Sequence, residues 1–159
     1  MVTMESVERF LGGRRVAVVG ASDGKDNFGG TIYRELRSHG YEVVAVNPHA
    51  DRVAGDPCVP DLASVPAPPV DGAVLVVHPD IAVEAVRACI DLGIPRVWLF
   101  KGIGGAGAVS DEVVRLCEDN GIDVVAGACP LMFLEPVGWF HRVHRATRRL
   151  NGSLVARAA

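Results

Sequence analysis

Five short apolar runs constrain the fold of this 159-residue chain more than any other feature. Each run is apolar throughout instead of alternating, which is typical of a strand covered on both faces. Segments with a helical period separate the runs. This alternation predicts an α/β, Rossmann-like, doubly wound sheet of five mainly parallel strands flanked by helices. The predicted strands are Val16–Val19, Val43–Val46, Ala73–Val77, Val97–Phe100 and Val124–Ala126.

The signals for helix ends agree with three helices between these strands. One helix spans about Thr31 to His39 and is closed by Gly40, and a second spans 79–93, with Pro79 in its first turn. The third is introduced by Ser110 and ends near residue 121. Proline suits a first helical turn, glycine a C-terminal cap and serine an N-terminal cap.

The connection from 47 to 70 differs, because it holds six of the ten prolines. Proline lacks the backbone N–H that helices and inner strands need. We therefore expect a mostly irregular crossover with at most a short helix around 61–65. The whole chain, 1–159, is predicted to be one domain, in which 134–159 forms a helical tail with a basic helix over about 137–150.

Composition excludes several classes of protein. The formal net charge is −3, and without a basic field neither nucleic acid nor an anionic membrane surface is an expected partner. The charge is uneven: all 19 acidic residues lie at or before Glu135, whereas five of the 16 Lys and Arg follow it. The four cysteines form no CxxC pair, which argues against zinc and against a disulfide scaffold. With no apolar run of signal or membrane-span length, we expect a cytoplasmic protein.

The loop after the first predicted strand has the composition of a diphosphate site. Glycines let backbone N–H groups approach an anion, the start of the following helix adds partial positive charge, and Lys25 could add a full one. The GxGxxG fingerprint is nevertheless absent. A loop that merely joins strand and helix stays open as the alternative. The candidate binding residues here are Gly20, Ala21, Ser22, Asp23, Lys25, Asn27, Phe28 and Gly29.

The end of the second strand discriminates between nucleotides. NAD-binding folds place Asp or Glu there to bind the ribose hydroxyls, whereas this chain has Asn47 and Pro48. The nearby His49 and Arg52 suit a ribose that carries a phosphate, as in coenzyme A (CoA) or NADP.

Taken in order, several segments resemble the small stand-alone CoA-binding proteins, whose domain is similar to the CoA-binding domain of the succinyl-CoA synthetase α subunit. The resemblance covers about 14–133. The matching segments are VAVVGASD from Val16, GYEVVAVNP from Gly40, VDGAVLVVHP from Val70, VWLFKGI from Val97 and GIDVVAGACPLMF from Gly121.

This resemblance implies that CoA, or an acyl-CoA, is the ligand. Its diphosphate would lie on the loop 20–30, and its adenine near Asn47 and Pro48. The adenine would also lie near the turn of His78, Pro79 and Ile81, and the pantetheine arm would pass Lys101, Gly102 and Ile103 toward Cys129 and Pro130. Family members often have Gln where this chain has Phe100 in WLFKG, so the contacts there can differ.

The sequence indicates binding without catalysis, because no second domain with a phosphate-accepting histidine is visible and His78 has no evident nucleophile beside it. CoA or acyl-CoA binding by a sensor or carrier is the leading interpretation. An NAD(P)-dependent oxidoreductase is an alternative that rests on the fold alone. A third interpretation is a nucleotide-sensing interaction subunit, whose basic tail helix docks a protein partner or a second copy.

Two further residue sets leave alternatives open. His141 and His144 have a spacing that could contribute two ligands to a metal, but a basic solvated face is favoured, and no metal is predicted. Cys129 could form a mixed disulfide with CoA, although a small buried apolar residue is favoured.

Overall fold

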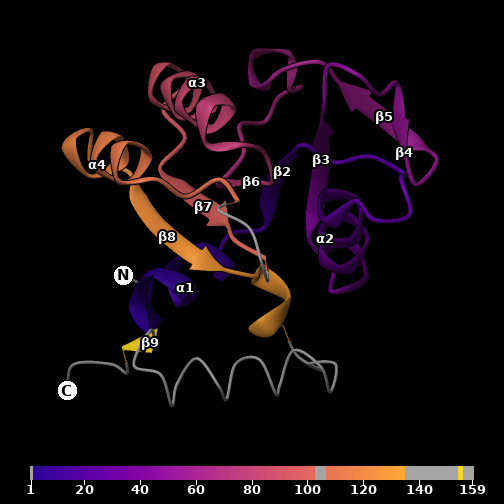
Figure 1. The fold of residues 1–159 in the computed structure, drawn as a ribbon. Coiled ribbons are helices and arrows are strands. Elements are labelled where there is room, and N and C mark those ends of the chain that lie inside the picture. The colour runs from indigo at the N-terminus through magenta and orange to yellow at the C-terminus, as the bar shows by residue number, and fades with distance from the viewer. Residues whose placement is uncertain (1, 103–106, 135–153, 156–159) are drawn as a thin grey trace.

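A computed structural model describes residues 2–102, 107–134, 154 and 155. Its centre is a seven-stranded sheet in the order β4-β5-β3-β2-β6-β7-β8 (Figure 1). Six of the strands are parallel; only β4 is antiparallel to its neighbour. Counted along the chain, the parallel strands have the 3-2-1-4-5-6 order of a Rossmann fold. The strands are β2 (Arg15–Val19), β3 (Glu42–Val46), β4 (Arg52–Val53), β5 (Asp56–Val59), β6 (Gly72–Leu75), β7 (Arg96–Phe100) and β8 (Asp123–Ala128).

All five predicted strands are confirmed, and they lie next to one another in the sheet as β3, β2, β6, β7 and β8. The two additional strands, β4 and β5, lie in the proline-rich connection that was expected to be mostly irregular. They are short: β5 pairs with β3 at only two residues, and Pro57, which has no backbone N–H to donate, lies in β5 opposite Arg52 of β4. The expected short helix is present as a 3-10 turn, Leu62–Ser64.

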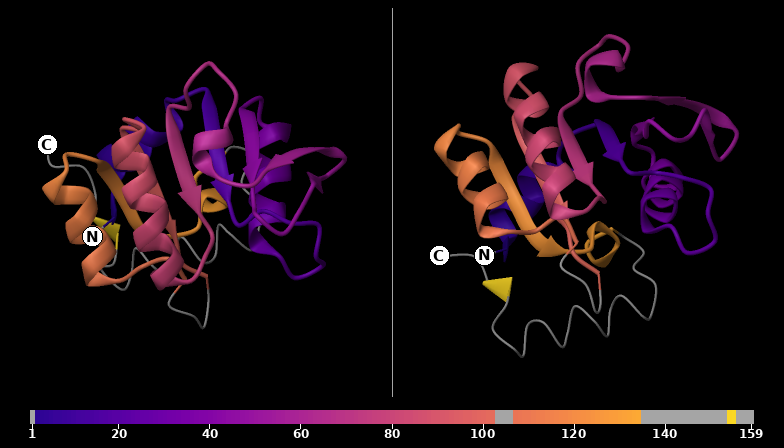
Figure 2. Two further views of the ribbon diagram at one scale, coloured as in Figure 1. Left: turned by 90° about the horizontal axis from the view of Figure 1, so that it is seen from above. Right: turned by 45° about the horizontal axis from the view of Figure 1, so that its top comes forward.

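Helices cover both faces of the sheet, as the apolar runs predicted. α1 (Met4–Leu11) and α2 (Phe28–Ser38) pack on one face, where Val16 and Val18 point. α3 (Pro79–Asp91) and α4 (Asp111–Asp119) pack side by side on the other face (Figure 2). Successive strand residues point to opposite faces, so each inner strand contributes to two apolar cores.

Two elements at the N-terminus were not predicted. β1 (Val2–Thr3) pairs in parallel with β9 (Leu154–Val155), and α1 follows it directly. Thr3 caps α1 by accepting a hydrogen bond from Ser6 N, and Arg9 joins α1 to the start of β8 through Asp123. The predicted tail helix, 137–150, with His141 and His144, lies outside the described residues. Within the described part of the chain, no helix is long and apolar enough to cross a membrane.

Candidate functional site

The site is positioned by the reversal of strand order between β2 and β6. The chain leaves β2 toward one edge of the sheet and β6 toward the other, and in doubly wound folds ligands bind at such a reversal. Gly20 follows β2 with φ +91°, and a Cβ there would lie 2.3 Å from Val76 O. Only glycine fits this position, which holds the loop after β2 against the end of β6.

Two further glycines bring α2 equally close. A Cβ on Gly29 would lie 2.4 Å from Gly20 O, and one on Gly30 would lie 2.0 Å from Ser22 O. Gly20 thus makes the tight turn and Gly29 and Gly30 permit close packing of helix on strand, which are tasks of the glycines in GxGxxG. The GxGxxG spacing is missing because the loop is longer. The close approach of α2 to the backbone after β2, which such glycines permit, is present.

Asn27 shapes this loop from within. Its Oδ1 accepts hydrogen bonds from Gly30 N, at 2.7 Å, and from Ser22 N, at 3.1 Å, and so caps α2 and closes the loop. The side-chain oxygen of Asn27 is therefore engaged inside the protein. Asp23 also makes an internal contact, because its Oδ1 accepts a hydrogen bond from Ala54 N at 2.9 Å.

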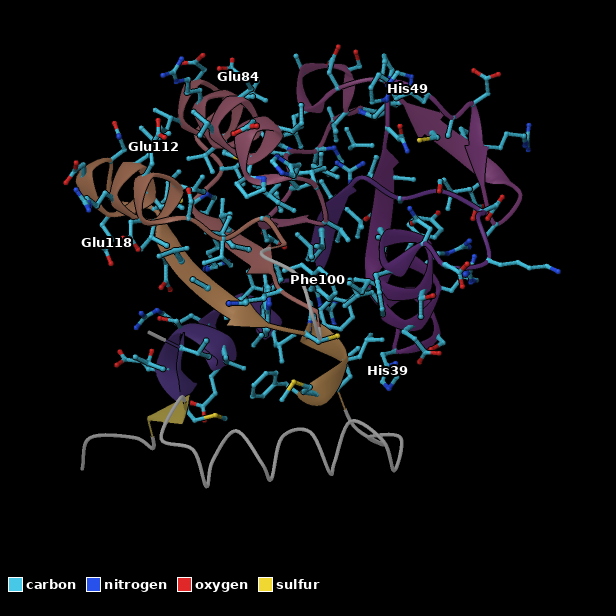
Figure 3. All side chains as sticks on the ribbon, in the orientation of Figure 1. His39, His49, Glu84, Phe100, Glu112 and Glu118 are labelled. Carbon is cyan, nitrogen blue, oxygen red and sulfur yellow. The ribbon has the colours of Figure 1, made fainter. Side chains whose placement is uncertain are left out.

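Lys25 and Phe28 are among the loop residues whose side chains are exposed to solvent. Phe28 is 57% exposed although it is a large apolar residue, and its ring centroid lies 5.4 Å from that of the buried Phe100 at the end of β7. Figure 3 shows Phe100 at the edge of the sheet where the strands β7 and β8 end. The aromatic pair thus joins the loop after β2 to the end of β7.

The end of β3 is tied to the same loop. Asn47 Nδ2 donates to Ala21 O at 2.9 Å, and Asn47 Oδ1 accepts from His49 N at 2.9 Å. A neutral amide with internal partners thus occupies the place where NAD-binding folds present a carboxylate. His49 is exposed (Figure 3), and the guanidinium of Arg52 donates to Gly55 O within its own hairpin.

The end of β6 leads into α3 and presents a second exposed apolar residue. His78 precedes Pro79, the first residue of α3, and its Nδ1 lies 3.2 Å from Asp80 Oδ2. Ile81 is 55% exposed. His78 thus stands at the N-terminus of α3, on the predicted ligand side, with Asp80 as its partner.

The ends of β7 and β8 carry the remaining candidates. Lys101 and Gly102 are half-buried, whereas Ile103 lies outside the described residues. Near its end β8 contains a register shift at Gly127, and Trp98 Nε1 donates to Ala128 O at 2.9 Å. Cys129 is only 6% exposed and Pro130 is buried with it, which favours packing as the role of this thiol.

Sequence reasoning missed the hairpin of β4 and β5, which contacts the loop and α2. Asp56 accepts a hydrogen bond from the hydroxyl of Tyr33 at 3.0 Å and pairs with Arg37, both on α2. The available signal was the pair Ala54-Gly55 between two short segments, because a two-residue turn with glycine is typical of a hairpin.

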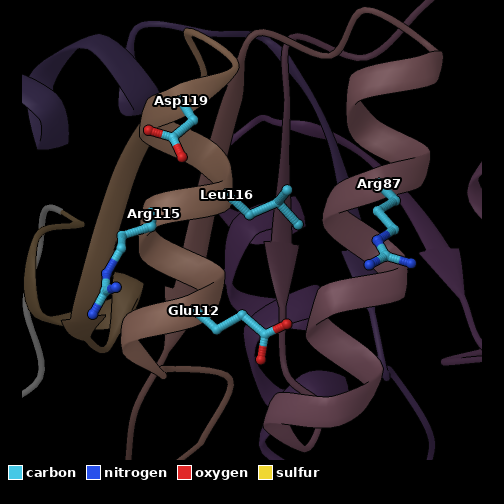
Figure 4. A pocket seen from close by; sticks show the side chains of 5 residues that line it. All are labelled: Arg87, Glu112, Arg115, Leu116 and Asp119. Atoms are coloured by element: carbon cyan, nitrogen blue, oxygen red, sulfur yellow. The ribbon is translucent and has the colours of Figure 1, made fainter.

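Two hollows lie away from these loops. A groove of about 340 Å³ between α3 and α4 is lined by charged residues of both signs around Leu116 (Figure 4). An apolar hollow of about 230 Å³ lies beside Leu92 and Ile94, at the edge of the sheet where the strands begin. Among the described residues, no group of three His, Cys, Asp or Glu side chains is placed to hold a metal ion.

Comparison with known proteins agrees with this geometry. The model of a CoA-binding domain family matches residues 14–135, which include every strand of the large sheet and every loop described above. The chain belongs to this family. The resemblance noted in the sequence is therefore confirmed, and so is the Rossmann-like fold class.

Relatives of the family include both large and small proteins. The ADP-forming acetate–CoA ligase I of Archaeoglobus fulgidus is 33% identical over 128 residues, 77% of this chain but only 18% of the ligase. The dinucleotide-forming acetyl-coenzyme A synthetase 1 of Candidatus Korarchaeum cryptofilum, solved with phosphate and ADP, is 31% identical with a TM-score of 0.63. The alignment covers 76% of this chain and 27% of that one. This chain thus spans a small part of either enzyme.

A small protein aligns over nearly its full length. The crystal structure of the PH1109 protein redesigned for binding is 26% identical, with a TM-score of 0.72, and the alignment covers 94% of this chain and 92% of that one. The domain thus occurs both within large synthetases and in chains of about this size.

Proposed function

We propose that this chain binds CoA or an acyl-CoA and does so without catalysing a reaction, as a sensor or a carrier. The observation that carries the proposal is the pairing of the loop 20–30 with a neutral β3 end, in a chain that belongs to a CoA-binding family. The loop offers backbone, an exposed lysine and a helix N-terminus to a diphosphate. Asn47 offers no carboxylate to a ribose diol, which favours CoA over NAD.

The two halves of CoA fit different parts of the site. We place the diphosphate at the loop after β2, and the adenosine between the end of β3 and the exposed Ile81 of α3. The 3′-phosphate would meet His49, which is exposed at the end of β3. The pantetheine arm would cross the apolar surface of Phe28 and follow the end of β7 toward Cys129.

Calorimetric titration with CoA, acetyl-CoA, ADP, NAD and NADP tests the ligand. CoA and acetyl-CoA should bind at least tenfold more tightly than NAD. NADP should bind no more tightly than CoA. Tighter binding of NAD or NADP than of CoA would refute the proposal and favour an oxidoreductase. Acetyl-CoA recovered intact after prolonged incubation would support the non-catalytic part, whereas release of free CoA faster than in buffer would contradict it.

Phe28→Ala gives this test a residue-level form. Its side chain is exposed, so the substitution should leave folding intact while CoA affinity falls about fivefold to twentyfold, the range expected for a lost apolar contact. Leu92→Ala is the matched control, because Leu92 is 45% exposed but lies at the opposite edge of the sheet. Equal affinities of the two variants would remove Phe28 from the site.

A further inference from the structure

The hairpin of β4 and β5 packs against the outside of the loop after β2. Its turn is Ala54-Gly55, with φ +51° and +82°, and the strands pair Arg52 with Pro57 and Val53 with Asp56. Figure 1 shows the hairpin at one end of the sheet, beyond β3, with α2 beneath it. The hairpin thus lies beside the loop that we assign to the diphosphate, and its turn contacts that loop through Ala54.

Two carboxylates join the hairpin to its neighbours. Asp23, in the loop, accepts a hydrogen bond from Ala54 N at 2.9 Å, and Arg34 of α2 lies 3.4 Å from the same oxygen. Asp56, in β5, accepts from the Tyr33 hydroxyl at 3.0 Å and pairs with Arg37. The loop, the hairpin and the middle and last turn of α2 are therefore linked through side chains.

The charge of Asp23 argues against a direct contact with the ligand. CoA is polyanionic, and a carboxylate in the loop that receives its diphosphate repels it. Asp23 is half-exposed, so burial does not remove that charge. The hydrogen bond from Ala54 N gives this carboxylate another task, because it ties the middle of the loop to the hairpin.

We propose that Asp23 is a positioning residue, which fastens the loop 20–27 to the hairpin 52–59 in the conformation that binds the diphosphate. The proposal rests on CoA binding as the function of the chain. Preorganisation of a loop raises affinity because the ordering entropy is then lost on folding and not on binding. Asp23 contributes to affinity through Ala54, against the sign of its own charge.

Two substitutions separate the hydrogen bond from the charge. Asp23→Ala removes both, whereas Asp23→Asn keeps the Oδ1 acceptor for Ala54 N and removes only the charge. We expect the Kd for CoA and for ADP to rise about tenfold in Asp23→Ala and to stay within threefold of the wild type in Asp23→Asn. Asp61→Ala is the matched control, because Asp61 also accepts a backbone hydrogen bond, from Ser64 N at 2.8 Å, but at a remote turn.

The affinities of these variants distinguish a role of the Asp23–Ala54 hydrogen bond from a role of the Asp23 charge. Tighter binding by both Asp23 variants would show that the carboxylate only repels ligand, and equal weakening of both would assign its role to the charge pair with Arg34; either result overturns the proposal. Unchanged affinity of Asp23→Ala also overturns it.

Amide hydrogen exchange without ligand separates this proposal from the proposed function. Asp23→Ala should speed exchange in the loop 20–27 and at Ala54 at least fivefold, whereas Asp61→Ala should not affect these amides. If the wild type fails to bind CoA, the proposed function fails, and the fastening is judged by exchange alone. Unchanged exchange in Asp23→Ala would then refute the fastening.

Discussion

At the scale of single residues, steric limits at a few glycines determine how closely α2 approaches β2. Gly29 is a clear case, since its missing Cβ would lie 2.4 Å from the backbone oxygen of Gly20, directly after β2. Gly24 lies in the same loop, and a Cβ there would meet nothing closer than 3.7 Å. The two glycines therefore allow a comparison within one loop.

Gly29→Ala should lower the free energy of unfolding by about 2–4 kcal/mol, because the backbone must shift to admit the methyl group. Gly24→Ala should change it by less than about 1 kcal/mol. Urea denaturation of both variants measures the difference. Similar stabilities would show that α2 can move away from β2 at little cost.

Asp71 is a second residue with a defined task. Its Oδ2 accepts hydrogen bonds from Arg15 N, at 2.9 Å, and Arg14 N, at 2.7 Å, and these bonds hold the pKa of Asp71 below its ordinary value of 3.8. The unfolded chain therefore takes up a proton at higher pH than the native protein. The stability contributed by Asp71 is present above about pH 4 and is lost as the pH falls through the lowered pKa.

Asp71→Asn should accordingly flatten the decline in unfolding free energy between pH 5 and pH 2, in the series of urea denaturation curves that measures it. The amide keeps an oxygen for the two N–H groups but does not titrate. A decline as steep as that of the wild type would show that other carboxylates account for the acid sensitivity.

At the scale of elements, sequence patterns predicted the strands that are buried on both faces and the helices that cover them. Apolar runs in the sequence predicted the strands β2, β3, β6, β7 and β8. Amphipathic segments with capping residues predicted α3 and α4. α1 is eight residues long and has no such strand before it, so its contact with β8 had no local signal. β4 and β5 pair with their neighbours at few residues, and Pro57 in β5 is a residue that argues against a strand.

The site was predicted in outline for the same reason. Loops at strand ends follow from strand positions, so Gly20, Asn47, His78 and Lys101 could be assigned to one edge of the sheet. The partners of Asp23 and Asn27 could not, because these hydrogen bonds depend on the three-dimensional path of a loop. Asn27 was named from the sequence as a candidate binding residue, and its role as the cap of α2 was not foreseen.

One buried indole donates a hydrogen bond beside the register shift near the end of β8. Trp98 packs between Phe10 and Phe133 and donates its only N–H to Ala128 O at 2.9 Å. Trp98→Phe should lower the unfolding free energy by about 1–3 kcal/mol, because a buried carbonyl loses its partner and the smaller ring leaves space. Phe10→Leu, which alters the same cluster without removing a hydrogen bond, is the control in urea denaturation. A smaller effect in Trp98→Phe than in Phe10→Leu would contradict this account.

At the scale of the whole molecule, the 3-2-1-4-5-6 strand order divides the proposed site into two halves. The loops after β2 and β3 belong to the half that we assign to adenosine and diphosphate. The ends of β6, β7 and β8 lie on the other side of the reversal. Of these, α3 after β6 carries Ile81, which we place against the adenosine, whereas the ends of β7 and β8 carry Phe100 and Cys129. A ligand that bridges the reversal must therefore stabilise both halves at once, whereas a fragment of it need not.

Hydrogen exchange with ADP and CoA can detect this division. ADP should slow exchange in the loop 20–30 and at the end of β3, and leave the amides of Lys101 and Gly102 unchanged. CoA should slow exchange in all of these segments, because its pantetheine arm reaches the ends of β7 and β8. The amides at the opposite edge, such as that of Ile94, should respond to neither ligand at concentrations where global unfolding does not limit exchange. Protection of Lys101 and Gly102 by ADP alone would mean that the diphosphate lies across the reversal, and the assignment of the two halves would then have to be exchanged.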